Sequence, residues 1–150
     1  MNTISAQPAK ERTDQKWSIS LWWLTTKALL LFLLIDAGLY FFGFDRVTQR
    51  ALAGSKRSKR RVGSAEDPYV GRAVAAVQIA TRMYYRNRLD CLPKSLALFL
   101  LLKKKVHVDF CLGVKKFPFA GHAWIEYQGQ VIGDSPTRIR AYTLLSRSHS

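Results

Sequence analysis

The chain has 150 residues, 48% of them hydrophobic, and a formal net charge of +14 at pH 7. These values predict one domain with a buried core and an acidic partner, while two cysteines without a Cys/His cluster at metal-ligand spacing argue against a metal site. Aromatic residues do not alternate with the basic run, so the composition does not favour nucleic acid as that partner.

Residues 1–62 are predicted to form a polar amino terminus, a hydrophobic helix and a basic linker. Residues 1–16 are polar and are expected to be disordered or frayed. Residues 17–44 are strongly apolar, but the run is short for a membrane span and contains Asp36. A helix packed on the domain or on a partner is therefore favoured over a spanning helix, and peripheral membrane association stays open. The start of the chain lacks the pattern of a signal peptide, so a cytoplasmic location is expected.

Five basic residues fall among the six positions 56–61, bracketed by glycine and serine. This run is typical of an exposed linker, and residues 63–150 are predicted to be the functional domain. Asp67 and Pro68 then have the pattern of a helix N-cap and first helical residue. The apolar residues that follow recur at helical spacing, and residues 87–90 are expected to end this helix.

A second helix is predicted over residues 92–105, with Asp90 as its cap and Pro93 in its first turn. It is apolar almost all round, which is typical of a buried central helix. Residues 103–105 are three lysines, which would complement the negative end of the helix dipole.

Three strands are predicted after this helix. Residues 106–114 alternate between apolar and other side chains, which indicates one buried face. Residues 122–127 and 130–134 follow, separated by a turn at a glycine. Residues 142–150 are expected to be helical or loose.

Cys91, His122 and Asp134 are the candidate catalytic residues. Cys91 falls at the start of the central helix, where free backbone N–H groups and the helix dipole stabilise a thiolate. If a three-residue loop, residues 127–129, joins the last two strands, His122 faces Asp134. That carboxylate would then orient the imidazole, as in a catalytic triad. A two-residue loop would place the pair on opposite faces.

Each candidate also has a plain structural explanation. A free cysteine is commonly a small buried hydrophobe, a strand histidine can bond to the backbone, and an aspartate before Ser-Pro can form a turn. Cys111 shares a strand face with His107 and Asp109 and is interpreted as structural. The backbone N–H of Cys91 is the natural oxyanion donor, and a second donor is not identified.

Four segments together resemble the transglutaminase-like leader peptidases of lasso peptide biosynthesis. They are residues 91–98 (CLPKSLAL), 113–114 (GV), 122–126 (HAWIE) and 134–136 (DSP). The resemblance covers roughly residues 69–136. Two departures are Lys94, where the family more often has arginine, and the phenylalanine-rich loop before His122; a lysine keeps the charge but not a bidentate fork.

The resemblance implies an α+β fold of the transglutaminase and papain type, with a central helix on a small antiparallel sheet. It also implies a cysteine peptidase that removes the leader from a ribosomally made precursor peptide before an ATP-dependent macrocyclase closes the ring. Cys91 would be the nucleophile, His122 the general base and acid, and Asp134 the orienting carboxylate, without a metal or cofactor. Residues 1–62 do not resemble a leader-recognition domain, so a separate recognition protein is expected.

Two other classes of function remain open. One is a different transglutaminase-like acyl transferase or amidase that uses the same three residues. The other is a non-catalytic scaffold of a peptide-maturation complex, in which Cys91 is inert.

Overall fold

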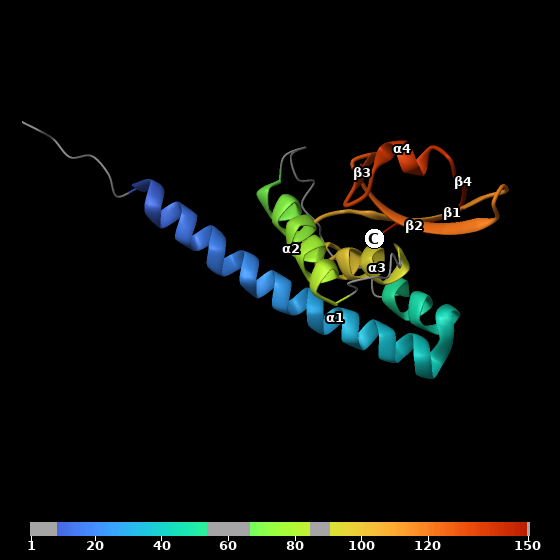
Figure 1. Ribbon diagram of the computed structural model, residues 1–150, viewed down its shortest axis with the longest axis horizontal. Helices are drawn as coiled ribbons and strands as arrows, with labels where there is room; N and C mark the ends of the chain where they lie inside the picture. Colours follow the sequence, from blue (N-terminus) through green and yellow to red (C-terminus); the bar gives the residue numbers. More distant parts are fainter. Residues whose placement is uncertain (1–8, 54–66, 85–90, 150) are drawn as a thin grey trace, which may run out of the picture.

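The computed structural model describes residues 9–53, 67–84 and 91–149 (Figure 1). It is an α+β fold in which one small antiparallel sheet has the strand order β3-β2-β1-β4. The elements in chain order are α1 (Ala9–Ala53), α2 (Pro68–Tyr84), α3 (Cys91–Leu102), β1 (Asp109–Lys115), β2 (Ala120–Tyr127), β3 (Gln130–Ile132), α4 (Pro136–Ile139) and β4 (Thr143–His149). The predicted fold class is therefore confirmed.

The central helix α3 lies between the pair α1 and α2 on one side and the sheet on the other (Figure 1). Because α3 is apolar nearly all round, only a position covered on several sides keeps it from water. Its Phe99 ring meets Phe110 of β1 edge to face, with 5.9 Å between ring centroids. The fully buried side chains at this junction include Phe32, Val77, Leu96, Phe99, Phe110 and Ile125.

Helix α1 begins at Ala9, earlier than the predicted frayed segment allowed, and bends at Gly43, which has a φ of 77°. One of its faces, which includes Ala28 and Phe32, is buried against the domain, so the predicted packing of a hydrophobic helix on the domain is confirmed. Lys103 links the carboxyl-terminal end of α1 to the end of α3, because its Nζ donates to the Ala51 carbonyl at 2.6 Å. This lysine follows α3 rather than belonging to it, so it complements the carboxyl end of α1, not of its own helix.

The start of α2 agrees with its sequence pattern. Asp67 precedes the helix and Pro68 is its first residue. The Asp67 Oδ1 accepts a hydrogen bond from the Tyr69 N–H at 2.8 Å, which satisfies one of the free donors at a helix start. The predicted helix break at residues 87–90, the Asp90 cap, the basic run and the boundary at residue 62 lie outside the described residues and stay predictions.

The hairpin between β2 and β3 differs from the predicted one. Tyr127 pairs with Gln130, so the loop has two residues, Gln128 and Gly129, instead of three. Both have positive φ, 52° and 76°, which is the backbone geometry that suits a two-residue hairpin. The predicted register is therefore wrong by one residue, and β3 ends at Ile132 rather than at residue 134.

Both faces of β1 are covered, in contrast to the predicted single buried face. Phe110 faces the helices, while Cys111, on the opposite face, is also fully buried. The Trp124 ring covers this second face and leaves no room for a side chain at Gly113, where an added Cβ would come within 2.8 Å of the ring. The tail is also corrected: Thr143–His149 forms the edge strand β4, paired with β1, and is not a helix or a loose end.

Candidate functional site

The first turn of α3 is fixed to β2 by a buried hydrogen bond. Cys91 is the first residue of α3 and is partly exposed. One turn later, the buried Ser95 hydroxyl donates to the Ala123 carbonyl at 2.8 Å. Residues four apart lie on the same side of a helix, so Cys91 lies along the side of α3 that meets β2. Ala123, which accepts the Ser95 bond, is next in sequence to His122.

His122 and Asp134 form the polar centre of the site. The His122 Nε2 lies 2.8 Å from the Asp134 Oδ2, and the two side chains are only 7% and 13% exposed. The second oxygen, Oδ1, accepts the Ser135 N–H at 2.7 Å. A carboxylate can only accept, so His122 donates from Nε2 and, when neutral, keeps the lone pair of Nδ1 for another proton.

This contact forms in spite of the register that was expected to prevent it. The strand pairing ends at Ile132, and Gly133 turns the chain with a φ of 73°. Asp134 therefore does not follow the alternation of β3, and its carboxylate reaches the imidazole from the loop. The positive φ favours glycine at this turn, and an added Cβ at Gly133 would lie 2.9 Å from the Leu98 Cδ2 of α3, so that side chain would have to shift.

Two aromatic rings hold the imidazole in place. The ring of Trp124, two residues along β2, stacks on His122 with 6.3 Å between centroids. Tyr142, just before β4, stacks on His122 at 5.0 Å. Trp124 is itself fixed by its Nε1–H, which donates to Glu126 at 2.9 Å. These contacts restrict the rotation of the imidazole, which a positioned proton-transfer group requires.

Burial raises the pKa of the Asp134 carboxyl, but the hydrogen bonds from Ser135 and His122 and the positive charge of Lys94 outweigh it. The net pKa is below the ordinary value, so Asp134 is ionised at neutral pH. Lys94 lies three residues after Cys91 on α3. The charge of this lysine in the first turn of α3 thus contributes to the low pKa of Asp134.

The structure brings His122 and Asp134 together directly. Cys91 lies at the start of α3, the helix whose Ser95 bonds to the strand residue after His122. Among the described residues, the Cys91 thiol makes no hydrogen bond to His122. Cys91 packs instead against the edge of the hydrophobic core. Catalytic hydrogen bonds commonly tighten only when substrate is bound, so this separation is compatible with a nucleophile and its base.

Cys111 has the opposite environment. It is completely buried, and it forms no disulfide with Cys91. Burial, together with the negative charges of Glu126 and Asp109, raises the pKa of its thiol to about 11 against the lowering effect of Arg147. A thiol of this kind is not a nucleophile at neutral pH. Within the described ranges no three His, Cys, Asp or Glu side chains gather at a spacing that would hold a metal ion.

Sequence reasoning missed Ser95, Trp124 and Tyr142 as parts of this site. Ser95 had a detectable signal, since it is a lone polar residue on an apolar helix one turn after Cys91. Trp124 also had one, because alternate strand residues share a face. Tyr142 had none, since its approach to His122 depends on how the chain returns to pair β4 with β1.

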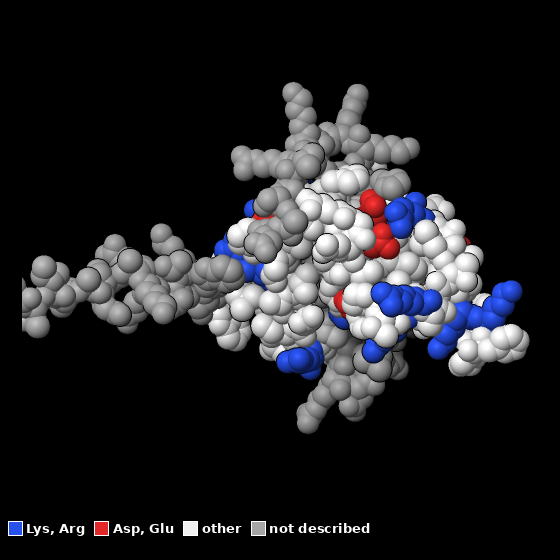
Figure 2. Space-filling model, turned by 90° about the horizontal axis from the view of Figure 1, so that it is seen from above, with Lys and Arg blue, Asp and Glu red and all other residues white. Residues whose placement is uncertain are grey.

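The basic side chains do not form a single patch on the face seen in Figure 2. Lys and Arg side chains lie in separate groups there, with acidic side chains beside some of them. One ion pair joins Arg147 and Glu126 at 2.9 Å. On this face the described basic side chains therefore do not mark one binding site.

Comparison with known proteins gives two findings. A family model described as the transglutaminase-like superfamily matches residues 31–147. The Microcin J25-processing protein McjB of Escherichia coli is 42% identical over 48 residues, which are 31% of this chain and 23% of that protein. No solved structure is significantly similar to the chain.

The pKa of Asp134 leads to a prediction about stability. Because its folded-state pKa is lowered, the bond to His122 stabilises the protein above the unfolded-state pKa of about 3.9 and is lost as pH falls through the folded value. We expect Asp134→Asn to lower the free energy of unfolding by about 1.5–3 kcal/mol at pH 6–7, the range for a hydrogen bond to a charged group. Urea unfolding measures this, and the difference from wild type should shrink below pH 4. A difference independent of pH would contradict the assignment.

The two cysteines should also react differently. With iodoacetamide at pH 8, we expect alkylation at the partly exposed Cys91 and none at Cys111, whose thiol is buried and protonated at that pH. Peptide mapping by mass spectrometry locates the label, and a Cys91→Ala variant should take up none while folded. Alkylation of Cys111 at a comparable rate in the folded protein would overturn this description of the two sites.

Proposed function

Because this chain belongs to the transglutaminase-like superfamily, we propose that it is a cysteine peptidase that removes the leader from a ribosomally made lasso precursor peptide. The observation that carries this proposal is the hydrogen bond of 2.8 Å between His122 and Asp134, next to a helix that begins at Cys91. A nucleophile, a base and a group that orients the base are the parts that acyl transfer through a thiol needs.

Each residue has one task in this reaction. The Cys91 thiol gives its proton to His122 Nδ1, and the sulfur attacks the scissile carbonyl carbon. The resulting imidazolium is stabilised by the Asp134 carboxylate, which accepts from Nε2. His122 then protonates the leaving amine as the C–N bond breaks, which leaves the leader as a thioester on Cys91. A water molecule, deprotonated by His122, hydrolyses the thioester and restores the thiol.

The start of α3 assists the same step. The first N–H groups of a helix have no partner within it, and they carry the positive end of its dipole. The backbone N–H of Cys91 is the donor that faces the developing oxyanion, and a second donor is not assigned. Water has limited access, because His122 is nearly buried beneath aromatic rings.

The lasso precursor as substrate rests on the similarity to a microcin J25-processing protein, which the chain covers only in part. The amine released by cleavage would be the group that an ATP-dependent macrocyclase uses to close the ring. We expect a separate leader-recognition protein to deliver the precursor. Residues 63–150 would form the domain that contains the three catalytic residues, and α1 packs against α2 and α3 of this domain.

Two alternatives predict different outcomes. An amidase or transglutaminase would use the same three residues but release ammonia from a side-chain amide. A scaffold would not need Cys91 at all. The low pKa of Asp134 and its bond to a buried histidine favour an acyl-transfer site over a scaffold, because perturbed titratable pairs concentrate at active sites.

We also propose that the protein is cytoplasmic and contacts the membrane peripherally. The exposed side of α1, opposite the face that is buried in the domain, supports such contact. Residues 19–53 are long and apolar enough to cross a membrane by length and composition. The face with Phe32 is buried in the domain, however, so a spanning position would expose the core. At the bend the aromatic side chains point to solvent, and they are Tyr40, Phe41, Phe42 and Phe44, which are 85%, 73%, 51% and 46% exposed. Arg50 lies 5.5 Å from the Phe42 ring, an arrangement that suits anionic headgroups.

The cleavage prediction compares four variants. With the cognate precursor and its recognition protein, we expect Cys91→Ala and His122→Ala to abolish leader release, because each removes a group that takes part in the chemistry. Asp134→Asn should lower the rate about 10⁴-fold, as loss of the orienting carboxylate does in a triad. Cys111→Ala is the matched control and should retain activity. Mass spectrometry of the products gives the rates, and release of ammonia without a leader fragment would indicate the amidase.

The membrane prediction uses a control on the same chain. We expect the double substitution of Phe41 and Phe42 by serine to lower binding to phosphatidylglycerol-containing vesicles at least 10-fold, because it removes apolar area that would enter the interface. The same double substitution of Phe117 and Phe119, which are 92% and 82% exposed in the β1–β2 turn, should leave binding unchanged. Cosedimentation measures both, and equal losses would contradict contact through α1.

A further inference from the structure

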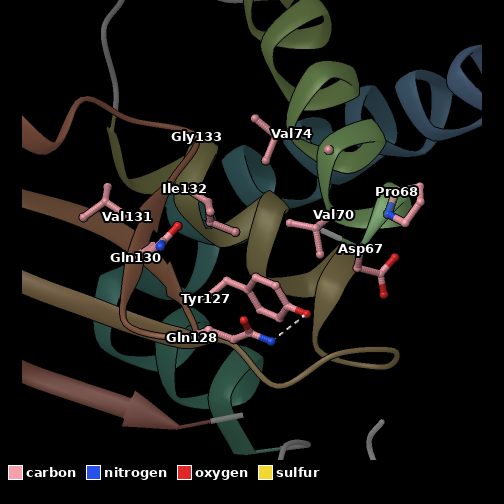
Figure 3. Close-up of a pocket in the computed structure, with 11 residues that line it drawn as sticks. Asp67, Pro68, Val70, Val74, Tyr127, Gln128, Gln130, Val131, Ile132 and Gly133 are labelled. Atoms are coloured by element: carbon pink, nitrogen blue, oxygen red, sulfur yellow. Dashed lines mark hydrogen bonds between the residues drawn. The ribbon is translucent and has the colours of Figure 1, made fainter. Parts of the chain in front are cut away.

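A cavity of about 540 Å³ lies between the start of α2 and the β2–β3 hairpin (Figure 3). The α2 side chains Val70 and Val74 point across it toward the hairpin residues Ile132 and Tyr127 (Figure 3). The amides of Gln128 and Gln130 add polar groups at the hairpin side of the cavity. The lining is therefore mainly apolar with a few hydrogen-bonding groups, which is the usual character of a ligand pocket.

The charge of the cavity differs from that of the protein. The chain has a net charge of +14, yet none of the residues that line the cavity is Lys, Arg or His. Asp67 is the one charged residue among them, and its Oδ1 already accepts the Tyr69 N–H. An acidic side chain is therefore disfavoured, since it would meet Asp67 and no counter-charge. The valine and isoleucine side chains of the lining favour an apolar occupant.

One wall of the cavity is the edge of the sheet. Strand β3 is at the end of the order β3-β2-β1-β4, so one of its sides has no strand beside it in the described part of the chain. In a two-residue hairpin the pair next to the loop, Tyr127 and Gln130, exchanges both backbone hydrogen bonds. The next pair, Glu126 and Val131, does not. The N–H and C=O of Val131 therefore point outward, where an extended peptide could pair with them.

The cavity borders the loop that carries Asp134. Gly133 lines it, and the next residue is Asp134, whose carboxylate bonds to His122. A peptide that follows the β3 edge would therefore run toward this loop, because an extended chain advances about 3.3 Å per residue.

We infer that this cavity is a substrate subsite: an extended segment of the peptide substrate pairs with β3 at Val131 and places an uncharged apolar side chain against Val70, Val74 and Ile132. This inference rests on the proposed peptidase function and adds to it where the substrate lies and which side chain is selected. Backbone pairing gives affinity without regard to sequence, and the pocket discriminates between side chains.

A large side chain at Gly71 would fill the cavity from the α2 side, which provides a test. It lies on α2 beside Val70 and lines the cavity, and an added Cβ there meets nothing within 4 Å. With the cognate precursor and its recognition protein, Gly71→Trp should raise KM about 10- to 200-fold, the range for losing an apolar group from a pocket. kcat should stay within twofold, because the catalytic residues are not touched. Gln78→Trp, at an exposed position of α2 that does not line the cavity, is the control and should leave KM unchanged. An unchanged KM for Gly71→Trp would overturn the subsite.

A binding measurement separates this inference from the proposed chemistry. In the Cys91→Ala chain, which cannot cleave, the Val131 amide should exchange with solvent at least 10-fold more slowly when the precursor is bound. Hydrogen exchange followed by NMR measures this, with the amide of Phe119 in the exposed β1–β2 turn, outside the cavity lining, as the control. Slower exchange at Val131 would support the subsite even if wild type failed to cleave the precursor. Unchanged exchange at saturating precursor would overturn it even if cleavage were normal.

Discussion

The placement of α3 governs everything else in this protein. A helix that is apolar almost all round must be covered on all sides, and α1, α2 and the sheet together provide that cover. The buried bond from Ser95 to the Ala123 carbonyl then fixes its position along β2. Because an unsatisfied buried carbonyl costs about 1–3 kcal/mol, this bond resists sliding of the helix along the strand. Cys91 lies one helical turn before Ser95, so the same bond also fixes the position of Cys91 relative to β2.

The second requirement is a loop that departs from strand geometry. The register of β2 and β3 alone would direct Asp134 away from His122. The left-handed turn at Gly133 cancels that effect, because glycine adopts a positive φ without strain. The two cysteines differ for a related reason, since Cys91 lies at a helix start and is partly exposed, while Cys111 is fully buried on β1, paired with Trp124 of β2. Packing thus assigns reactivity to one of two chemically identical side chains.

Local signals were sufficient for most elements and insufficient for the hairpin and the tail. Asp67 followed by Pro68, and the apolar run after Cys91, predicted two helices correctly because capping and periodicity act within a few residues. Gln128 made the two-residue loop hard to predict. Both loop residues have positive φ, as a type I′ turn requires, and glutamine rarely adopts a positive φ. Strand β4 has no apolar alternation and forms because β1 offers a free edge, which is a property of the folded chain and not of that segment.

The most direct measurement is to look for the acyl-enzyme. Wild type mixed with the cognate precursor and its recognition protein is quenched with acid within the first turnover and digested for peptide mapping by mass spectrometry. The account predicts a thioester between the leader and Cys91, absent in Cys91→Ala and more persistent in Asp134→Asn, where water activation by His122 is impaired. Leader release that continues in Cys91→Ala, with no adduct on Cys91 in wild type, would contradict it.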